Sequence, residues 1–430
     1  LYLTATGRND WESQLAFSEA SSFFYPSVGM SAVVSSMAKL PEWISFLKVR
    51  GSYTEVGSSF ERFITRPSYQ FNTASGSWNS TTIYPARNLK PEKTRSWELG
   101  INSKWLNNRL SFDLTYYRSN TINQTFTADL SISSGYSKAY IQSGSIRNEG
   151  IELALGYSDK WGAFSWDSNL TFSCNNNKIM KLTEGATNPM TGEPINKDNY
   201  DMGQLGNLDA RVKLYKGGSI GDIYGKAFVR DDAGNIVYET EGDNKGLPLV
   251  EGDGNTVKVG NANPVFMMGW DHTFSYKGFT LYFLLDWRYG GEVLSQTQAE
   301  MDLYGVSEIT ADARDRGYVM LDGQRIDNVK GFYKIVGGRA GVTEYYMYDA
   351  TNLRLREVSL SYNFSRRWIQ KTKVLKDVQL SFVARNLCFL YKKAPFDPDL
   401  VLSTGNDNQG IEVFGMPTTR SLGFTLKCEF

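Results

Sequence analysis

The chain has 430 residues, of which 41% are hydrophobic and 14% aromatic, and its 46 basic residues balance its 46 acidic residues. This composition excludes a disordered polyelectrolyte, and the balanced charge indicates no nucleic-acid partner. No run of about 18 apolar residues occurs, which excludes a helical membrane span. The chain starts at Leu1, without Met, inside a strand-like stretch, so we expect it to be a piece cut from a longer chain.

Apolar and polar residues alternate along the chain in segments of about ten residues. The first clear pair covers residues 97–105 and 110–117, joined by Asn107 and Asn108, which tolerate positive φ and indicate a tight hairpin turn. Similar alternation recurs at 151–157, 164–172, 270–276, 279–287, 358–364 and 421–430. Because neighbouring strand residues point to opposite faces, each segment has one apolar and one polar face. Tilted strands of this length cross a bilayer.

Ionisable residues occupy the polar face of these segments, among them Glu98, Asp113, Glu152, Asp271 and Asp286. Unpaired charges facing a packed core would cost several kcal/mol each, whereas charges facing a water-filled or plugged lumen cost little. The sequence therefore predicts an all-β protein, an antiparallel transmembrane β-barrel with about 12 strands in this chain.

The predicted connections alternate between short and long. Short links lie at 36–45, 107–108, 158–163, 277–278 and 365–377, and long ones at 58–94, 119–147, 178–262, 290–352 and 389–417. Outer-membrane barrels have short periplasmic turns and long extracellular loops, so we expect Phe430 to end on the periplasmic side. Residues 220–229 resemble a strand, and we expect them to form an extracellular hairpin within the 178–262 loop rather than part of the wall.

Several long stretches carry a likeness to one family: NLKPEKTRSWELGINSKWLNNRLSFDLTYYRSNT (88–121), IRNEGIELALGY (146–157), VGNANPVFMMGWDHTFSYKGFTLYFLLDWRYGGEV (259–293), LRLREVSLSYNF (353–364), VQLSFVARNL (378–387), FDPD (396–399) and PTTRSLGF (417–424). Together they resemble the C-terminal barrel half of SusC/RagA-like TonB-dependent outer-membrane transporters. In that family a 22-stranded barrel encloses an N-terminal plug, a periplasmic segment engages TonB, and a SusD-type lipoprotein caps the mouth.

The resemblance implies that residues 1–430 are the C-terminal portion of such a barrel, without counterparts of the plug and the N-terminal strands. It implies active import of a nutrient, an oligosaccharide or an oligopeptide, across the outer membrane, with no cofactor. The implied partners are a SusD-like surface lipoprotein, outer-membrane lipid, and the TonB–ExbB–ExbD energy-coupling complex, reached through the missing N-terminal part.

Other functions stay open at this point. The chain could be a self-contained passive porin of about 12 strands, another structural barrel or an outer-membrane enzyme of that size. A soluble lectin-like sandwich or propeller is a third class.

Catalytic motifs have little support. Residues 217–221, GGSIG, fit G-x-S-x-G, but a nucleophile elbow needs a strand before it, a helix after it and a His base. The single histidine, His272, shares the lipid-facing side of its segment with Trp270 and Phe274, so we expect no triad with Ser219. Carboxylates such as Glu98, Asp113 and Asp286 could form a glycosidase pair, but strand alternation places such residues inside any barrel. We predict no enzyme.

The acidic 231–254 region matches the place where the family often carries an EF-hand-like loop. It lacks the D-x-[DN]-x-[DN]-G spacing, so we expect Asp231, Asp232 and Asp253 in solvated turns and no metal site. Cys388 and Cys428 are predicted near opposite ends of one hairpin, about 30 Å apart, and therefore unbonded. Cys174 is expected to be a small apolar filler.

Aromatic residues in the predicted loops are the best candidates for ligand contact: Tyr69, Trp78, Tyr84, Tyr345, Tyr346, Tyr348, Phe389, Tyr391, Phe396 and Phe414. Such rings can stack on sugars or pack on peptide side chains. We select Trp78, Tyr84, Tyr345, Tyr346, Tyr391 and Phe396 as candidate ligand-binding residues. The alternative is that most of these rings only pack the loops on one another.

The same alternation places Leu426 on the lipid face and Thr425 on the inner face. Leu426→Arg is therefore expected to cost about 2 to 4 kcal/mol near the midplane, and Thr425→Arg to be tolerated for folding.

Overall fold

A computed structural model describes the chain except residues 19–20, 61–63, 67–68, 81, 86–88, 131–133, 196–197, 206–208, 252–256, 366–368, 370, 372–373, 404 and 406–407. It divides into two compact units, described separately here. The first contains residues 1–157, 173–200 and 215–218, and the second residues 158–172, 201–214 and 219–430. None of the helices in the described residues is long and apolar enough to cross a membrane.

Long antiparallel strands make up the wall of the first unit. Their order is β1 (Tyr2–Trp11), β2 (Ser22–Val33), β3 (Ile44–Ser58), β7 (Glu92–Trp105), β8 (Leu110–Asp129) and β9 (Lys138–Trp161). The predicted tight turn at Asn107 and Asn108 is confirmed, because both residues and Leu106 have positive φ, between 52° and 68°. The 3-10 helix η2 (Val34–Ser36) begins the other short link, between β2 and β3.

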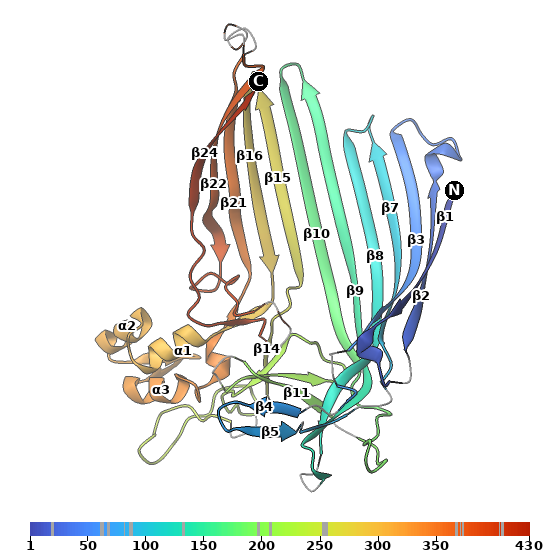
Figure 1. The fold of residues 1–430 in the computed structure, drawn as a ribbon. Coiled ribbons are helices and arrows are strands. Elements are labelled where there is room, and N and C mark those ends of the chain that lie inside the picture. The colour runs from blue at the N-terminus through green and yellow to red at the C-terminus, as the bar shows by residue number, and fades with distance from the viewer. Residues whose placement is uncertain are drawn as a thin grey trace. The chain divides into compact units, whose positions relative to one another are not determined.

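The wall of the second unit has the order β10 (Phe164–Lys181), β15 (Phe266–Tyr276), β16 (Phe279–Tyr289), β21 (Asn352–Asn363), β22 (Asp377–Lys392) and β24 (Ser421–Glu429). Lys277 and Gly278 form the tight turn between β15 and β16, both at positive φ. Figure 1 shows β15, β16, β21, β22 and β24 side by side, with the C-terminus at one end of these strands and the three helices at the other. Counting both walls, the predicted number of 12 antiparallel strands is confirmed.

The long connections contain smaller elements outside the wall. In the first unit these are η1 (Ser13–Leu15), β4 (Tyr69–Asn72), β5 (Ser77–Ser80) and β6 (Ile83–Tyr84). A four-stranded sheet is formed by β11 (Asn199–Gln204), β12 (Arg211–Tyr215), β13 (Asp222–Gly225) and β14 (Val257–Asn261). Residues 220–229 thus contribute β13 to a separate sheet, as expected for a segment outside the wall.

The connection from β16 to β21 contains the helices of the second unit. They are α1 (Gln296–Leu303), α2 (Glu308–Arg316), α3 (Val329–Val336) and the 3-10 helix η4 (Thr343–Tyr346). Ser295, Ser307 and Asn328 cap the N-termini of α1, α2 and α3 by accepting a backbone N–H. Around them lie β18 (Val319–Leu321) with β19 (Gln324–Ile326), and β17 (Glu292–Ser295) with β20 (Met347–Asp349) and β23 (Ile411–Glu412).

The prediction of a loop over 119–147 was wrong. β8 and β9 continue as paired strands, with Asp129 opposite Lys138, so the connection covers only residues 130–137. The cause lies in the sequence pattern. Beyond Arg118 both faces of these strands carry polar residues, so the apolar alternation that marks a lipid-facing strand disappears although the pairing continues.

The register groups the outward residues of the first unit into rows across β3, β7, β8 and β9. The Trp105 row contains Trp105, Leu110 and Tyr157, and the Trp97 row contains Tyr53, Trp97, Arg118 and Glu149. Between them lie apolar residues such as Ile101, Leu114 and Leu153, in one row. From Trp97 to Trp105 the strand advances eight residues, about 26 Å at 3.3 Å per residue. Barrel strands are tilted by about 35 to 45°, so the two rows are separated by roughly 20 Å along the membrane normal, which fits within the apolar band of an outer-membrane barrel, about 25 Å tall.

The second unit repeats this spacing. The Tyr276 row contains Tyr276, Phe279, Tyr362, Leu380 and Leu426, and the Trp287 row contains Met268, Trp287, Leu353 and Tyr391. Eight residues again separate the two rows along β15, about 26 Å. Halfway between them lies the His272 row, with His272, Phe283, Val358, Ala384 and Leu422. Leu426 lies on the outward face with its row partners Leu380 and Tyr362, as the alternation predicted.

Candidate functional site

On the inner face of the first unit, an ion pair connects β3 to β8 across the intervening strand β7. Arg50 of β3 donates from Nη2 to Asp113 Oδ1 of β8 (2.8 Å) and to Thr115 Oγ1 (2.6 Å). Asn102 of β7 donates from Nδ2 to Asp113 Oδ2 (2.8 Å). The guanidinium passes over Gly100 of β7, where a Cβ would lie 2.6 Å from Arg50 Nε. A side chain at position 100 would therefore displace the Arg50 guanidinium from its place over β7.

A larger ionic cluster covers the inner face of β16 and β21 in the second unit. Arg356 donates from Nε to Asp286 Oδ2 (2.9 Å), and Arg354 donates from Nη2 to Asp397 Oδ1 (2.5 Å). Asp399 lies 3.2 Å from Arg354 Nη2. Asp397 and Asp399 are the two carboxylates of the FDPD segment, which the sequence analysis singled out only as a family motif.

These ion pairs account for the presence of carboxylates on the inner face without a catalytic role. Asp113 and Asp286 are each held by an arginine, so neither is poised as half of a glycosidase pair. The ion pairs of Asp397 and Asp399 are contacts that the sequence analysis missed. The signal that could have found them is the combination of arginines at alternate positions of β21 with a short acidic loop motif downstream.

The GGSIG segment lies in a turn and not at a nucleophile elbow. Ser219 Oγ accepts from Asn263 Nδ2 (2.9 Å), and the Ser219 backbone N–H donates to Asp222 Oδ2 (2.9 Å). The segment leads into β13, a strand, where the motif requires a helix.

His272 lies where the sequence predicted, on the face with Trp270 and Phe274. Its ring is 7% exposed and stacks at 6.0 Å on Trp166, whose Nε1 donates to His272 Nδ1 (3.2 Å). An Nδ1 that accepts this hydrogen bond leaves the proton of the neutral ring on Nε2.

The candidate ligand-binding aromatics fall into two groups. Trp78 and Tyr391 are 68% and 48% exposed, and Tyr69 and Phe414 are likewise exposed. Tyr84 packs edge-on against Tyr136 at 5.3 Å, and Phe396 packs edge-on against Tyr348 at the same distance. Half-buried Phe389 lies under the Arg354 guanidinium, 4.2 Å from Cζ to the ring centroid.

Tyr345 and Tyr346 are structural side chains. Tyr346 is 1% exposed, and its hydroxyl donates to Asp302 Oδ2 (3.1 Å), while Tyr345 packs edge-on against Phe332 at 5.4 Å. Tyr346, a candidate ligand-binding residue from the sequence, is therefore buried within its own unit. The reason is tertiary, because the α1 to α3 segment packs over it and supplies a buried acceptor.

Asp302 is the buried acceptor at the centre of that helical segment. It is 1% exposed and accepts from Gln298 Nε2 (2.7 Å), Ser307 Oγ (2.5 Å) and Tyr346. Burial raises the pKa of the Asp302 carboxyl above its ordinary value, and its three donors oppose this. Burial likewise raises the pKa of Tyr346.

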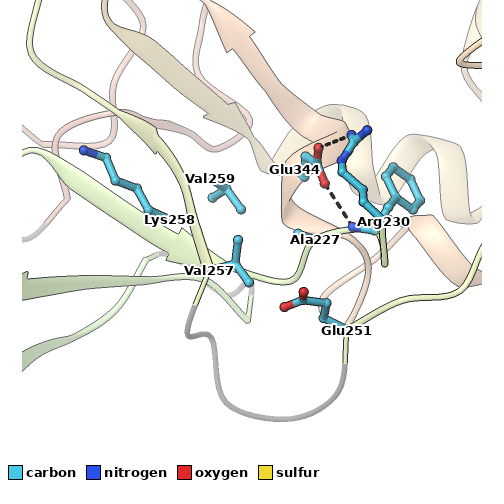
Figure 2. A pocket seen from close by; sticks show the side chains of 8 residues that line it. Ala227, Arg230, Glu251, Val257, Lys258, Val259 and Glu344 are labelled. Carbon is cyan, nitrogen blue, oxygen red and sulfur yellow. Dashed lines mark hydrogen bonds and ion pairs between the residues drawn. The ribbon is translucent and has the colours of Figure 1, made fainter. Parts of the chain in front are cut away.

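A small cavity lies beside β14 in the second unit, with a volume of about 260 Å³. Figure 2 shows Glu344 directed at Arg230 on one side and Glu251 and Val257 on the others. Glu344 accepts from Arg230 Nη2 (2.7 Å) and from the backbone N–H of Phe228 (2.9 Å). The carboxylate is thus already satisfied within the chain, and we assign no ligand to this cavity.

The acidic 231–254 region forms turns where it is described. Asp231 Oδ1 accepts from the backbone N–H groups of Ala233 and Asn235 (2.9 and 2.8 Å), and Asp232 is exposed. Asp253 lies outside the described residues. Among the residues that the structure describes, no group of three or more His, Cys, Asp or Glu side chains is placed to hold a metal ion.

The three cysteines are free. On β22 the register places Val378 opposite Cys428, whereas Cys388 faces Leu355 near the other end of the strand.

With the wall and its two faces established, comparison with known proteins gives the family. The sequence profile described as "TonB dependent receptor-like, beta-barrel" matches residues 1–387. The chain belongs to this family. It is a SusC/RagA-like outer-membrane β-barrel, as the resemblance predicted, and membership of a transporter family agrees with the prediction of no enzyme.

The matched relatives are much longer than this chain. TonB-dependent receptor P3 of Formosa agariphila is 24% identical over 455 residues, which cover 99% of the chain and 44% of that receptor. TonB-dependent receptor SusC of Bacteroides thetaiotaomicron is 24% identical over 325 residues, 73% of the chain and 30% of SusC. The chain thus spans less than half the length of these curated relatives.

A solved structure shares the fold. The RagAB peptide importer in its open-open state matches with a TM-score of 0.74 and 18% identity, covering 100% of this chain and 45% of that one. The closed-closed state of the same importer gives a TM-score of 0.72.

Proposed function

We propose that this chain forms the C-terminal half of the barrel of a SusC-like TonB-dependent importer, which takes up a nutrient oligosaccharide or oligopeptide across the outer membrane. One observation carries the proposal: a wall with an apolar outer band and a cross-linked ionic inner face, in a chain of this receptor family. The names SusC and RagAB peptide importer support import as the activity of the longer protein.

The proposed organisation places residues 1–430 within a 22-stranded barrel, with residues 178–262 as an extracellular excursion. The proposed partners are a SusD-like surface lipoprotein above the loops and the TonB–ExbB–ExbD complex, engaged through residues outside this chain. Exposed apolar side chains on the helical connection of the second unit, such as Tyr304 (73%) and Val306 (70%), support a protein contact on that side.

Uptake by the full-length transporter, expressed with its lipoprotein, tests the proposal. Cells are given labelled panels of oligosaccharides and oligopeptides, with and without a protonophore. We expect one panel to be imported, and import to stop when the proton gradient collapses. Uptake that persists without the gradient and shows no preference between panels would instead support a passive porin.

The exposed candidate Trp78 provides a test at the level of residues. We expect Trp78→Ala to raise the half-saturating ligand concentration several-fold, because a ring that stacks on a sugar or packs on a peptide side chain contributes about 1 kcal/mol. Tyr391→Ala, whose ring lies in the outward Trp287 row, and Tyr84→Ala, whose ring packs on Tyr136, are the matched variants. If Trp78→Ala leaves uptake unchanged at equal abundance, ligand contact through this ring is excluded.

A further inference from the structure

A row of charged side chains lies directly above the apolar band of the first unit. This Arg95 row contains Glu55, Arg95, Asn120 and Arg147, paired in register across β3, β7, β8 and β9. It follows the Trp97 row, which itself contains Arg118, by two residues, about 7 Å along the strands. The residues of the Arg95 row share the outward face with Trp97, because on each strand they lie two positions from the Trp97 row.

Positive charge exceeds negative charge in this region. Lys93, Arg95, Arg118 and Arg147 are matched by two carboxylates, Glu55 and Glu149. Glu55 is already shared by Lys93 Nζ (2.8 Å) and Arg95 Nε (3.1 Å).

Arg118 and Arg147 have weaker partners. The Arg118 Nε lies 3.7 Å from Glu149 Oε2, beyond hydrogen-bond distance, and has no hydrogen-bond partner among the described residues. Arg147 Nε donates to the neutral amide oxygen of Asn120 (3.0 Å). In these contacts, neither the Arg118 nor the Arg147 guanidinium, both on the outward face, is hydrogen-bonded to a carboxylate.

The height of the row indicates what lies against it. The apolar band beneath faces hydrocarbon, so a surface continuous with the band and roughly 5 Å above its aromatic edge along the membrane normal lies in the lipid headgroup layer. Long cationic side chains rest their alkyl stems on such an edge and direct their heads to the polar layer. The short links of this unit, at 34–43 and 106–109, lie at the opposite ends of the strands, which assigns the row to the outer leaflet.

We propose that Arg118 and Arg147, assisted by Arg95, bind phosphate groups of an outer-leaflet lipid. Guanidinium groups match the geometry of phosphate oxygens and bind them with paired, charge-assisted hydrogen bonds. A bound phosphate supplies the negative charge that this part of the wall lacks. The contact is independent of the imported ligand and holds the protein at a defined depth in the membrane.

The test measures binding of lipid A, with its phosphates or after enzymatic dephosphorylation, to the full-length transporter in detergent by native mass spectrometry. We expect the unmodified protein to bind phosphorylated lipid A roughly tenfold more tightly or better. The double variant Arg118→Gln with Arg147→Gln is expected to lose most of this preference. The matched control, Lys39→Gln with Arg109→Gln, removes two charges at the opposite ends of the strands and is expected to retain it.

The outcomes separate clearly. Equal binding of both lipids by the unmodified protein would overturn the proposal without any variant, so a variant that fails to fold does not obscure the result. Loss of the preference in the Lys39 and Arg109 variant alone would place the contact at the other leaflet and overturn it as well. The lipid-binding test does not use uptake measurements, so a failure of the import proposal would not affect its result.

Discussion

Arg354 of β21 and Asp397 of the FDPD segment form a buried ion pair, with 2.5 Å between Nη2 and Oδ1 and side chains only 2% and 5% exposed. The Arg354 guanidinium also lies over the ring of Phe389, and Thr418 donates to the other Asp397 oxygen. Residues from β21, from β22 and from the connection to β24 therefore meet at one arginine. This contact fastens the last long connection to the inner face of the wall.

Removing the carboxylate should destabilise the barrel. Asp397→Asn leaves the buried Arg354 without its closest counter-charge, and we expect a loss of about 3 to 5 kcal/mol. The temperature at which the protein loses its folded migration on heat-modifiability gels measures the change. Asp349→Asn is the control, because its partner Lys393 (2.6 Å) is half exposed, and it should cost at most about 1 kcal/mol. Similar losses of stability in both variants would contradict a stabilising role for the buried Arg354–Asp397 ion pair.

Charge on the lipid face should destabilise the barrel. Leu426 of β24 lies on the outward face and its neighbour Thr425 on the inner face, so Leu426→Arg is expected to cost about 2 to 4 kcal/mol near the midplane and Thr425→Arg little. Unfolding of both variants in detergent and in lipid measures the difference. Equal losses would show that the two faces are interchanged.

Gly100 should not accept a side chain. A Cβ there would lie 2.6 Å from Arg50 Nε, so Gly100→Val displaces the guanidinium from Asp113, and we expect a loss of about 1.5 to 3 kcal/mol, the value of a charged hydrogen bond. Gly423 of β24 also points to the inner face but has nothing within 4 Å of its Cβ position. Gly423→Val should be neutral or stabilising, because β-branched residues favour strands. Thermal unfolding measures the stability of both variants. Equal losses would exclude displacement of the Arg50 guanidinium as the cause.

The helical connection of the second unit should depend on pH through Asp302. Burial raises the pKa of this carboxyl in the folded state, so the folded protein binds the proton more tightly than the unfolded chain. The stability contributed by the protonated form is therefore present at low pH and decreases as pH rises from the unfolded pKa through the raised folded pKa.

Hydrogen exchange of residues 296–336, corrected for intrinsic rates, measures this dependence. We expect protection to fall between about pH 4 and the raised pKa in the unmodified protein. In Asp302→Asn, where no proton is exchanged, protection should be flat over the same range. Protection that rises with pH in the unmodified protein would contradict the assigned direction.

The sequence by itself determined the wall. Alternation at 97–105, 110–117 and 279–287, with turn residues such as Asn107 and Gly278 between segments, specified strands, faces and hairpins, because both signals depend on neighbouring residues only. Where strands leave the membrane that signal ends. Residues 119–147 therefore predicted a loop, although backbone pairing between β8 and β9 continues there.

Only the tertiary structure decided which distant residues meet. The Arg354 and Asp397 pair is 43 positions apart, and Tyr346 finds its acceptor Asp302 at a separation of 44. The physical reason is that a periodic pattern specifies to which face a side chain points, whereas packing of long connections specifies which partner it meets there.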